Sequence, residues 1–278
     1  MQTPTHQDLS RLAESAAYEA GQRVKELQGE IRTVNSKGFR DFVTDADLLA
    51  QAIITNLIRE QYPAHGFLTE EADDSLPQSG PIIWIIDPVD GTTNYSRNHP
   101  NYSISIAAAT NNLPPGSVID KEGLKQLYPA VGVIYDPVHS EMFTGAAGFG
   151  STLNNDPIRE SKISKLSDAV IGLDWGRSYE QRERMLELLG RLAHQVHTIR
   201  AVGSAAQALA WVACGRLDVY INLSIGPWDC AAGRVIINEA GGIVSNLSGR
   251  PWQISDPGCV ASNGSLQASV LEMIQNLS

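Results

Sequence analysis

The first periodic segment of the chain has apolar residues at three- and four-residue steps: Leu9, Leu12, Ala13, Ala16, Ala17, Ala20, Val24 and Leu27. This spacing predicts an amphipathic helix over residues 7–28. A second helix is predicted from Thr44 through Ile58, because Thr44-Asp45-Ala46-Asp47 has the pattern of a capping box. Between the two helices, residues 31–43 predict a hairpin.

A run of large apolar residues from Ile82 to Ile86 stops at an acidic turn that begins with Asp87. Such a short run between turn residues is typical of a buried strand. Further strands are predicted at residues 102–109, 131–135 and 141–144, with a surface excursion of unassigned role at 111–128. Residues 1–148 therefore predict an α+β lobe.

Residues 149–278 alternate strands and helices more regularly. Strands are predicted at 169–173, 197–199, 218–221 and 243–245, and helices at 179–194, 204–214 and 229–240. The last of these helices would begin at Asp229, as its N-cap. We expect an α/β lobe here. Because no clear linker separates the lobes, we treat residues 1–278 as one unit.

The acidic turn places Asp87 and Asp90 three residues apart, with Pro88 restricting the backbone between them. Two carboxylates this close repel each other unless a cation lies between them. A hard divalent metal ion, which prefers oxygen ligands, is the cation that such a pair would bind. The backbone N–H groups of Gly91 and Thr92 follow and could bind an anion. A metal with a phosphate beside it is one interpretation, and a surface turn that only ends a strand is the other.

The composition of the whole chain narrows the range of partners. A formal charge of −10 and a pI near 5.0 argue against binding to nucleic acid or an anionic membrane. The three cysteines are too few and too scattered for a disulfide framework, so we expect reduced thiols and a cytoplasmic location. No apolar run reaches the length of a membrane span.

Other acidic positions have an ordinary explanation when each is taken alone. Glu70 and Glu71 belong to a cluster of four acids within five residues, which a solvated loop would also explain. Asp229 would cap a helix, with Trp228 anchoring the turn before it.

Several of these segments follow one another along the chain in a characteristic order: Glu70-Glu71, then the stretch from Trp84 to Tyr95, then Trp228-Asp229 followed by Glu239-Ala240-Gly241-Gly242. Together with Thr44–Asp47 and residues 200–206, they resemble the inositol monophosphatase family of metal-dependent, lithium-sensitive sugar phosphatases. The resemblance implies a five-layered αβαβα sandwich of the inositol monophosphatase and fructose-1,6-bisphosphatase type. It also implies a homodimer.

The same resemblance assigns roles to individual residues. It implies that two or three Mg²⁺ ions are held by Glu70, Asp87, the carbonyl of Val89, Asp90 and Asp229, with Glu71 acting through water. It implies that Thr92 and Asp47 help Glu70 to orient the attacking water. The residues implied to contact the substrate are Asp90, Gly91, Thr92, Thr93, Gly203, Ser204 and Ala205.

The expected function is hydrolysis of inositol monophosphate or a similar small polyol phosphate. Fructose 1,6-bisphosphate, histidinol phosphate and adenosine 3′,5′-bisphosphate are alternative substrates, and a regulatory protein with a structural metal site is the non-enzymatic alternative. By the same resemblance, Asn222 lies where inositol-specific relatives have an acidic residue that contacts the sugar ring. We therefore expect Asn222 to influence substrate choice, although it could also simply end a strand.

Overall fold

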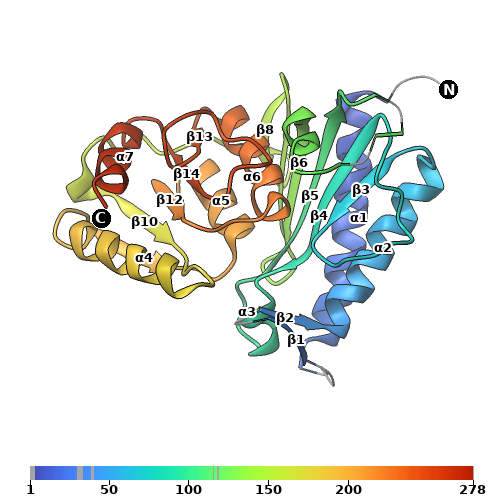
Figure 1. Ribbon diagram of the computed structural model, residues 1–278, viewed down its shortest axis with the longest axis horizontal. Coiled ribbons are helices and arrows are strands. Elements are labelled where there is room, and N and C mark those ends of the chain that lie inside the picture. The colour runs from blue at the N-terminus through green and yellow to red at the C-terminus, as the bar shows by residue number, and fades with distance from the viewer. Residues whose placement is uncertain (1–3, 30–33, 39–40, 115, 118, 278) are drawn as a thin grey trace.

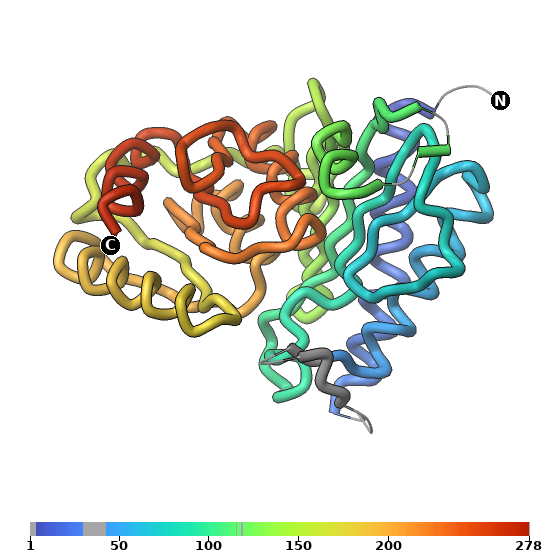
Figure 2. Tube along the Cα trace, viewed as in Figure 1, coloured from blue at the N-terminus to red at the C-terminus, as the bar shows by residue number. Residues whose placement is uncertain are grey.

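The computed structural model describes residues 4–29, 34–38, 41–114, 116–117 and 119–277. Its elements stack in five layers that alternate helices and sheets (Figure 1). The sheet order and the covering helices give the αβαβα sandwich that the sequence predicts. Figure 2 shows that the first helix of the described chain lies in one outer layer and the last helix in the opposite one.

The first outer layer consists of α1 (His6–Leu27) and α2 (Asp45–Gln61). Both begin with capping interactions, and the backbone N–H and hydroxyl of Thr44 donate to the carboxylate of Asp47 at the start of α2. Between these helices, β1 (Val34–Gly38) pairs with β2 (Asp41–Thr44), as the predicted hairpin requires. Part of that prediction, residues 31–33 and 39–40, lies outside the described residues.

The second layer is a large sheet in which seven strands of the described chain follow the order β3-β4-β5-β6-β7-β8-β9. Its strands are β3 (Gly66–Thr69), β4 (Ile82–Asp90), β5 (Ser103–Asn111), β6 (Leu127–Asp136), β7 (Glu141–Ala146), β8 (Gly150–Leu153) and β9 (Asp156–Pro157). The short helix α3 (Thr92–Ser96) follows β4, and the 3₁₀ helix η1 (Gly123–Gln126) lies in the 111–128 excursion.

The middle layer contains α5 (Ala205–Ala213) and α6 (Pro227–Ala240), which lie between the two sheets. Beyond them, five strands of the described chain follow the order β11-β10-β12-β14-β13. These are β10 (Val170–Leu173), β11 (Thr198–Ala201), β12 (Val219–Asn222), β13 (Ile243–Ser245) and β14 (Cys259–Ser262), with the 3₁₀ helix η2 (Leu166–Asp168) before β10. The last layer is α4 (Tyr179–Leu192) and α7 (Gln267–Gln275).

Strand β4 connects two hydrophobic cores, and all of its residues are buried. Ile83 and Ile85 pack in the core shared with α5 and α6, whereas Trp84 and Ile86 pack in the core under α1 and α2. This alternation confirms the predicted buried strand and explains why its apolar run has no polar positions. A further core lies between the smaller sheet and α4 and α7.

The structure corrects the prediction for the end of the chain. The helix predicted to start at Asp229 begins two residues earlier, at Pro227, and it is not the last, because α7 follows it. Proline is favoured in the first turn of a helix, where its missing N–H is not needed. The lobe boundary at residues 148 and 149 remains a proposal, while the large sheet itself continues through β9. Within the described ranges, every helix is too short or too polar to cross a membrane.

Candidate metal and phosphate site

Asp87 and Asp90 lie on either side of a β-bulge at the end of β4. Asp87 is in register with Ser105 and Asp90 with Ser103, so three steps along β4 match two steps along β5. Pro88 lies within the bulge, where a residue without an N–H does not interrupt the ladder. Residues two apart on a regular strand share a face. The extra residue of the bulge lets Asp87 and Asp90, which are three apart, also share one, and this face is the side of the sheet that holds α6.

Asp229 reaches the same place from the first turn of α6. Its Oδ2 accepts a hydrogen bond of 2.7 Å from the N–H of Gly226, so it caps the helix from inside the first turn, as the third helical residue. The hydroxyl of Ser105 donates to the carbonyl of Trp228 over 3.1 Å and joins α6 to β5. The start of α6 is thereby held against the end of the large sheet.

The carboxylates of Asp87, Asp90 and Asp229 form one cluster, with an oxygen of each within 4.8 Å of the others. Burial, followed by the negative charges of Glu70 and its aspartate neighbours, raises the pKa of Asp87 well above its usual range. Burial and the charges of Asp90 and Glu70 raise the pKa of Asp229 to about 7. Buried acids that repel in this way, with oxygens converging on one point, fit a hard divalent cation.

The N-terminus of α5 fixes the orientation of Asp90. The Ser204 hydroxyl donates to Oδ2 of Asp90 over 2.5 Å, and the N–H of Ala206 donates to the same oxygen over 2.7 Å. The N–H of Ala205 donates to Oδ1 over 3.2 Å. These bonds favour the ionised carboxylate, but burial is the larger effect and raises the pKa of Asp90 to about 6.

Thr92 and Asp47 are in contact. The hydroxyl of Thr92 lies 3.0 Å from Oδ1 of Asp47 and 3.1 Å from the carbonyl oxygen of Val89. Asp47 is fully buried, and Thr44 fixes its other carboxylate oxygen. The pair therefore forms a rigid link between α2 and the turn after β4.

Gly91 makes this turn possible. Its φ of +98° lies in the left-handed region, and a side chain would approach the carbonyl oxygens of Asn101 and Gly203 within 3.0 and 3.1 Å. Its own carbonyl accepts a hydrogen bond from the N–H of Tyr95, which begins α3. The turn thus packs closely against the loop before α5.

Glu70 and Glu71 occupy different environments. Glu70 follows β3, and its N–H donates to the carbonyl of Ile86 over 3.1 Å. Its side chain lines the same cavity as the aspartates, and Nη2 of Arg177 lies 3.8 Å from its Oε1. Glu71 is buried, and its carbonyl accepts a hydrogen bond from Gln51 over 2.9 Å.

A cavity of about 670 Å³ collects most of the predicted site residues. Those that line it are Glu70, Asp87, Val89, Asp90, Gly91, Thr92, Thr93, Gly203, Ala205, Asn222 and Asp229. Asp47, Glu71 and Ser204 are not in its lining, and Asp47 and Ser204 contact residues that are. The lining also includes residues to which the sequence assigns no role at the site, namely Asn94, Asp174, Trp175, Gly176, Arg177, Arg182, Ser224, Ile225, Gly226 and Trp228.

Asn222 ends β12 at the edge of this cavity, and both ends of its amide bind protein groups. Its Nδ2 donates to the Tyr220 hydroxyl over 3.0 Å, and its Oδ1 accepts from the N–H of Ser224 over 2.9 Å. The Tyr220 hydroxyl donates in turn to Oδ2 of Asp174 over 2.8 Å, and Oδ1 of Asp174 accepts from the N–H of Gly203 over 2.7 Å. This hydrogen-bond chain connects Asn222 to the loop before α5.

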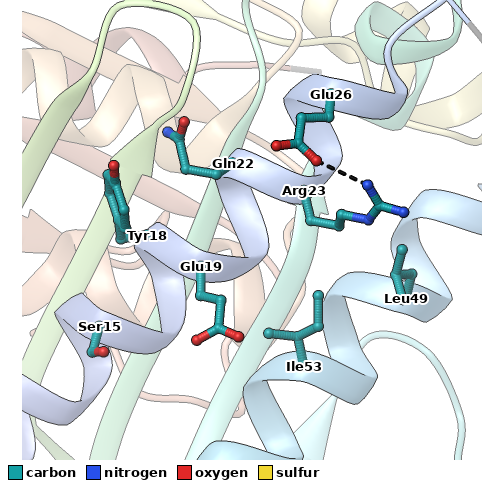
Figure 3. A pocket seen from close by; sticks show the side chains of 8 residues that line it. All are labelled: Ser15, Tyr18, Glu19, Gln22, Arg23, Glu26, Leu49 and Ile53. Carbon is teal, nitrogen blue, oxygen red and sulfur yellow. Dashed lines mark hydrogen bonds and ion pairs between the residues drawn. The ribbon is translucent and has the colours of Figure 1, made fainter.

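Another cavity, of about 430 Å³, lies on the outer helical layer between α1 and α2 (Figure 3). Its charged side chains include Arg23 and Glu26, whose ion pair of 2.8 Å is marked in Figure 3. It shares no lining residue with the acidic cavity. The predicted site residues line the acidic cavity at the end of β4, so that cavity is the candidate site.

A five-layered sandwich with converging carboxylates at the end of a bulged strand defines a phosphomonoesterase of the inositol monophosphatase and fructose-1,6-bisphosphatase fold. Residues 6–278 match the model of the inositol monophosphatase family. The chain belongs to that family.

Individual relatives agree with this assignment. The chain is 35% identical over 270 residues to inositol monophosphatase 1 of Solanum lycopersicum, and the match covers 95% of this chain and 93% of that protein. The solved structure of an IMPase from Thermotoga maritima has a TM-score of 0.84 and 30% identity, covering 96% of this chain and 97% of that one. A Staphylococcus aureus structure described as inositol monophosphate bound SaIMPase-II has a TM-score of 0.74 and 26% identity. The match covers 95% of this chain and 92% of that one.

Proposed function

We propose that this phosphomonoesterase is Mg²⁺-dependent and hydrolyses inositol monophosphate or a similar small polyol phosphate. The observation that carries the proposal is the convergence of Asp87, Asp90 and Asp229, whose carboxylate oxygens lie within 4.8 Å of one another in the lining of one cavity. The names of the relatives from Solanum lycopersicum and Staphylococcus aureus support an inositol ester.

The carboxylates of Glu70, Asp87, Asp90 and Asp229, with the carbonyl of Val89, would hold two or three Mg²⁺ ions, and Glu71 would act through water. Bound Mg²⁺ lowers the pKa of a water and stabilises the charge that develops on the leaving oxygen. The donor set consists of oxygens only, which is the set that Mg²⁺ prefers.

Other residues of the site would bind and orient the reactants. In our proposal, Thr92, fixed by Asp47, positions the attacking water together with Glu70. The N–H groups of Gly91 and Thr92 would bind the phosphate, which places fixed donors where negative charge builds up. Thr93, Gly203, Ser204, Ala205 and Asn222 would border the polyol.

Asp90 has a double role in this proposal, because it would hold a cation and also accept a hydrogen bond from a substrate hydroxyl. Its three donors from the start of α5 leave the carboxylate in one orientation. A fixed ligand costs less entropy when the cation and the substrate bind.

A phosphate-release assay tests the function directly. The purified protein is treated with EDTA, then assayed with inositol 1-phosphate before and after Mg²⁺ is added. We expect no turnover without Mg²⁺ and full recovery with it. A protein that binds Mg²⁺ but releases no phosphate from inositol, fructose, histidinol or nucleotide esters would be the regulatory alternative.

We also propose a cytoplasmic homodimer, on the basis of the family relationship. Light scattering coupled to gel filtration distinguishes a chain of 30.1 kDa from a particle of twice that mass.

A further inference from the structure

The acidic cavity has a positively charged wall. Of the described residues that line the cavity, Arg177 and Arg182 are the ones with a Lys or Arg side chain. The acidic residues of the same lining are Glu70, Asp87, Asp90, Asp174 and Asp229. The side chain of Arg177 is 56% exposed and lies near Glu70, and Nε of Arg182 donates to the carbonyl of Gly176 over 2.9 Å.

The segment that carries this wall is held at both ends. Asp174 uses both of its carboxylate oxygens, one for the N–H of Gly203 and one for the hydroxyl of Tyr220. Arg182 reaches back from α4 to the carbonyl of Gly176. The segment from Asp174 to Arg177 is therefore fixed before any ligand binds, which lowers the entropic cost of recognition.

Gly176 lets α4 approach this segment closely. A side chain at position 176 would meet Cβ of Gln181 at 2.3 Å, well inside normal contact. The close approach brings Arg182, one residue further along α4, to the same wall as Arg177.

The two arginines and the groups proposed to bind the reacting phosphate belong to segments that follow strands of different sheets. Gly91 and Thr92 follow β4 of the large sheet, whereas Arg177 and Arg182 follow β10 of the smaller sheet. The cavity of about 670 Å³ has room for a ligand much larger than one phosphate group.

The carboxylates of the cavity would repel a second anionic group on the substrate. Two guanidinium groups oppose that repulsion, and their fork of N–H donors matches the oxygens of a phosphate. Asn222, at the same cavity, is neutral and adds no further negative charge.

We propose that Arg177 and Arg182 bind a second phosphate group of the substrate, so that the protein prefers small esters that carry two phosphates over the matching monophosphates. The proposal rests on the phosphomonoesterase function proposed above and specifies its substrate class. Arg177 supplies the exposed end of the site and Arg182 the end that is fixed to the backbone.

The test compares fructose 1,6-bisphosphate with fructose 1-phosphate, which differ only in the distal phosphate. We expect kcat/KM of the natural protein with Mg²⁺ to be about tenfold or more higher for the bisphosphate, mainly through a lower KM. The ratio of the two kcat/KM values should fall about tenfold or more in Arg177→Gln and in Arg182→Gln. Arg177→Lys, which keeps the charge but loses the fork, should give an intermediate ratio.

The matched control is Arg184→Gln, a change on the same helix that lies outside the cavity lining and should leave the ratio unchanged. Circular dichroism and the melting temperature establish that each variant folds. If the arginine variants slow both fructose esters equally, or slow neither, the arginines do not bind a second phosphate.

The natural protein gives separate readouts for the two proposals. Turnover of inositol 1-phosphate without a preference for the bisphosphate, or without turnover of either fructose ester, overturns this inference alone. No turnover of any of these esters with Mg²⁺ overturns the proposed function itself.

Discussion

The hydroxyl of Ser204 lies 2.5 Å from Oδ2 of Asp90, although the two residues are 114 positions apart in the chain. This bond joins the end of β4 in one sheet to the start of α5 in the middle layer. A residue proposed to hold a metal is thus oriented by a helix from the other half of the chain.

Asp90→Asn should lose most of the activity while the protein still folds. The amide keeps an acceptor for Ser204 but removes the negative charge that a cation needs. We expect kcat to fall on the order of 10³-fold or more at saturating Mg²⁺. Asp74→Asn, at an exposed acidic position, is the control. Undiminished turnover by Asp90→Asn would end the proposed mechanism.

Stability of the metal-free protein should depend on pH through the buried carboxylates. Folding raises the pKa of Asp229 from 3.8 to about 7, so the folded protein binds protons more tightly than the unfolded chain. Stability is then full below about pH 4 and falls as pH rises to about 7. In EDTA, the melting temperature should drop on the order of 5 °C between pH 5 and pH 8, and Mg²⁺ should restore it most at pH 8. A melting curve that shows no such loss, or no difference from Asp229→Asn, would contradict the assignment.

Asp174→Ala should disturb the loop before α5, because it leaves the N–H of Gly203 and the hydroxyl of Tyr220 without their acceptor. Asp174→Asn keeps an acceptor for Gly203 and presents a donor to the tyrosine oxygen, so it should recover part of the loss. We expect KM for inositol 1-phosphate to rise about tenfold in the alanine variant and less in the asparagine variant. Equal effects of the two changes would show that these hydrogen bonds do not position the loop.

Asn222→Glu should shift selectivity toward inositol esters. The hydrogen of the Tyr220 hydroxyl is already donated to Asp174, so a carboxylate at position 222 finds no donor there and is expected to turn toward the cavity. It would accept a ring hydroxyl and repel a second phosphate. The kcat/KM ratio of inositol 1-phosphate to fructose 1,6-bisphosphate should rise about tenfold. A ratio that stays constant would remove Asn222 from the specificity determinants.

Li⁺ should inhibit the enzyme at high Mg²⁺. This expectation comes from the family relationship, since oxygen ligands alone do not identify a lithium-sensitive site. Steady-state rates measured over a wide Li⁺ range provide the check, with Na⁺ at equal concentration as the control for ionic strength. Rates that respond equally to both ions would leave the phosphatase function intact and reject lithium sensitivity.

The places of Asp87, Asp90 and Asp229 in the secondary structure were predictable because these residues lie in short segments with local signals, whereas their grouping into one site came from the family resemblance. Asp87 and Asp90 stand at the end of an apolar run, and Asp229 stands at a helix start, so each could be placed before the fold was known. The helix start was misplaced by two residues because an aspartate three positions into a helix can cap it as well as one before it.

The positive wall of the cavity was not predictable in the same way. Arg182 lies on the polar face of a helix, where an arginine usually serves solubility, and Arg177 lies in an ordinary loop. The proximity of Arg177 to Glu70 depends on how two sheets are packed across the middle layer, which no local pattern records. The hydrogen bond between Asn222 and Tyr220 is local, since the two residues are two apart on β12, but the bond from Tyr220 to Asp174 joins β12 to the segment after β10 and has no signal in either segment alone.

The bulge at Pro88 makes the length of this segment matter as much as its composition. Removing a single residue between Asp87 and Asp90 would leave two steps on each strand, so that Asp87 could stay opposite Ser105 and Asp90 opposite Ser103 in a regular ladder. The bend that the bulge puts into β4 would be lost, and the chain would enter the left-handed turn at Gly91 and the start of α3 from a different direction. A sequence can therefore change at many positions around this turn and still fold, whereas an insertion or deletion of one residue would change how the two aspartates are oriented relative to the turn that follows them.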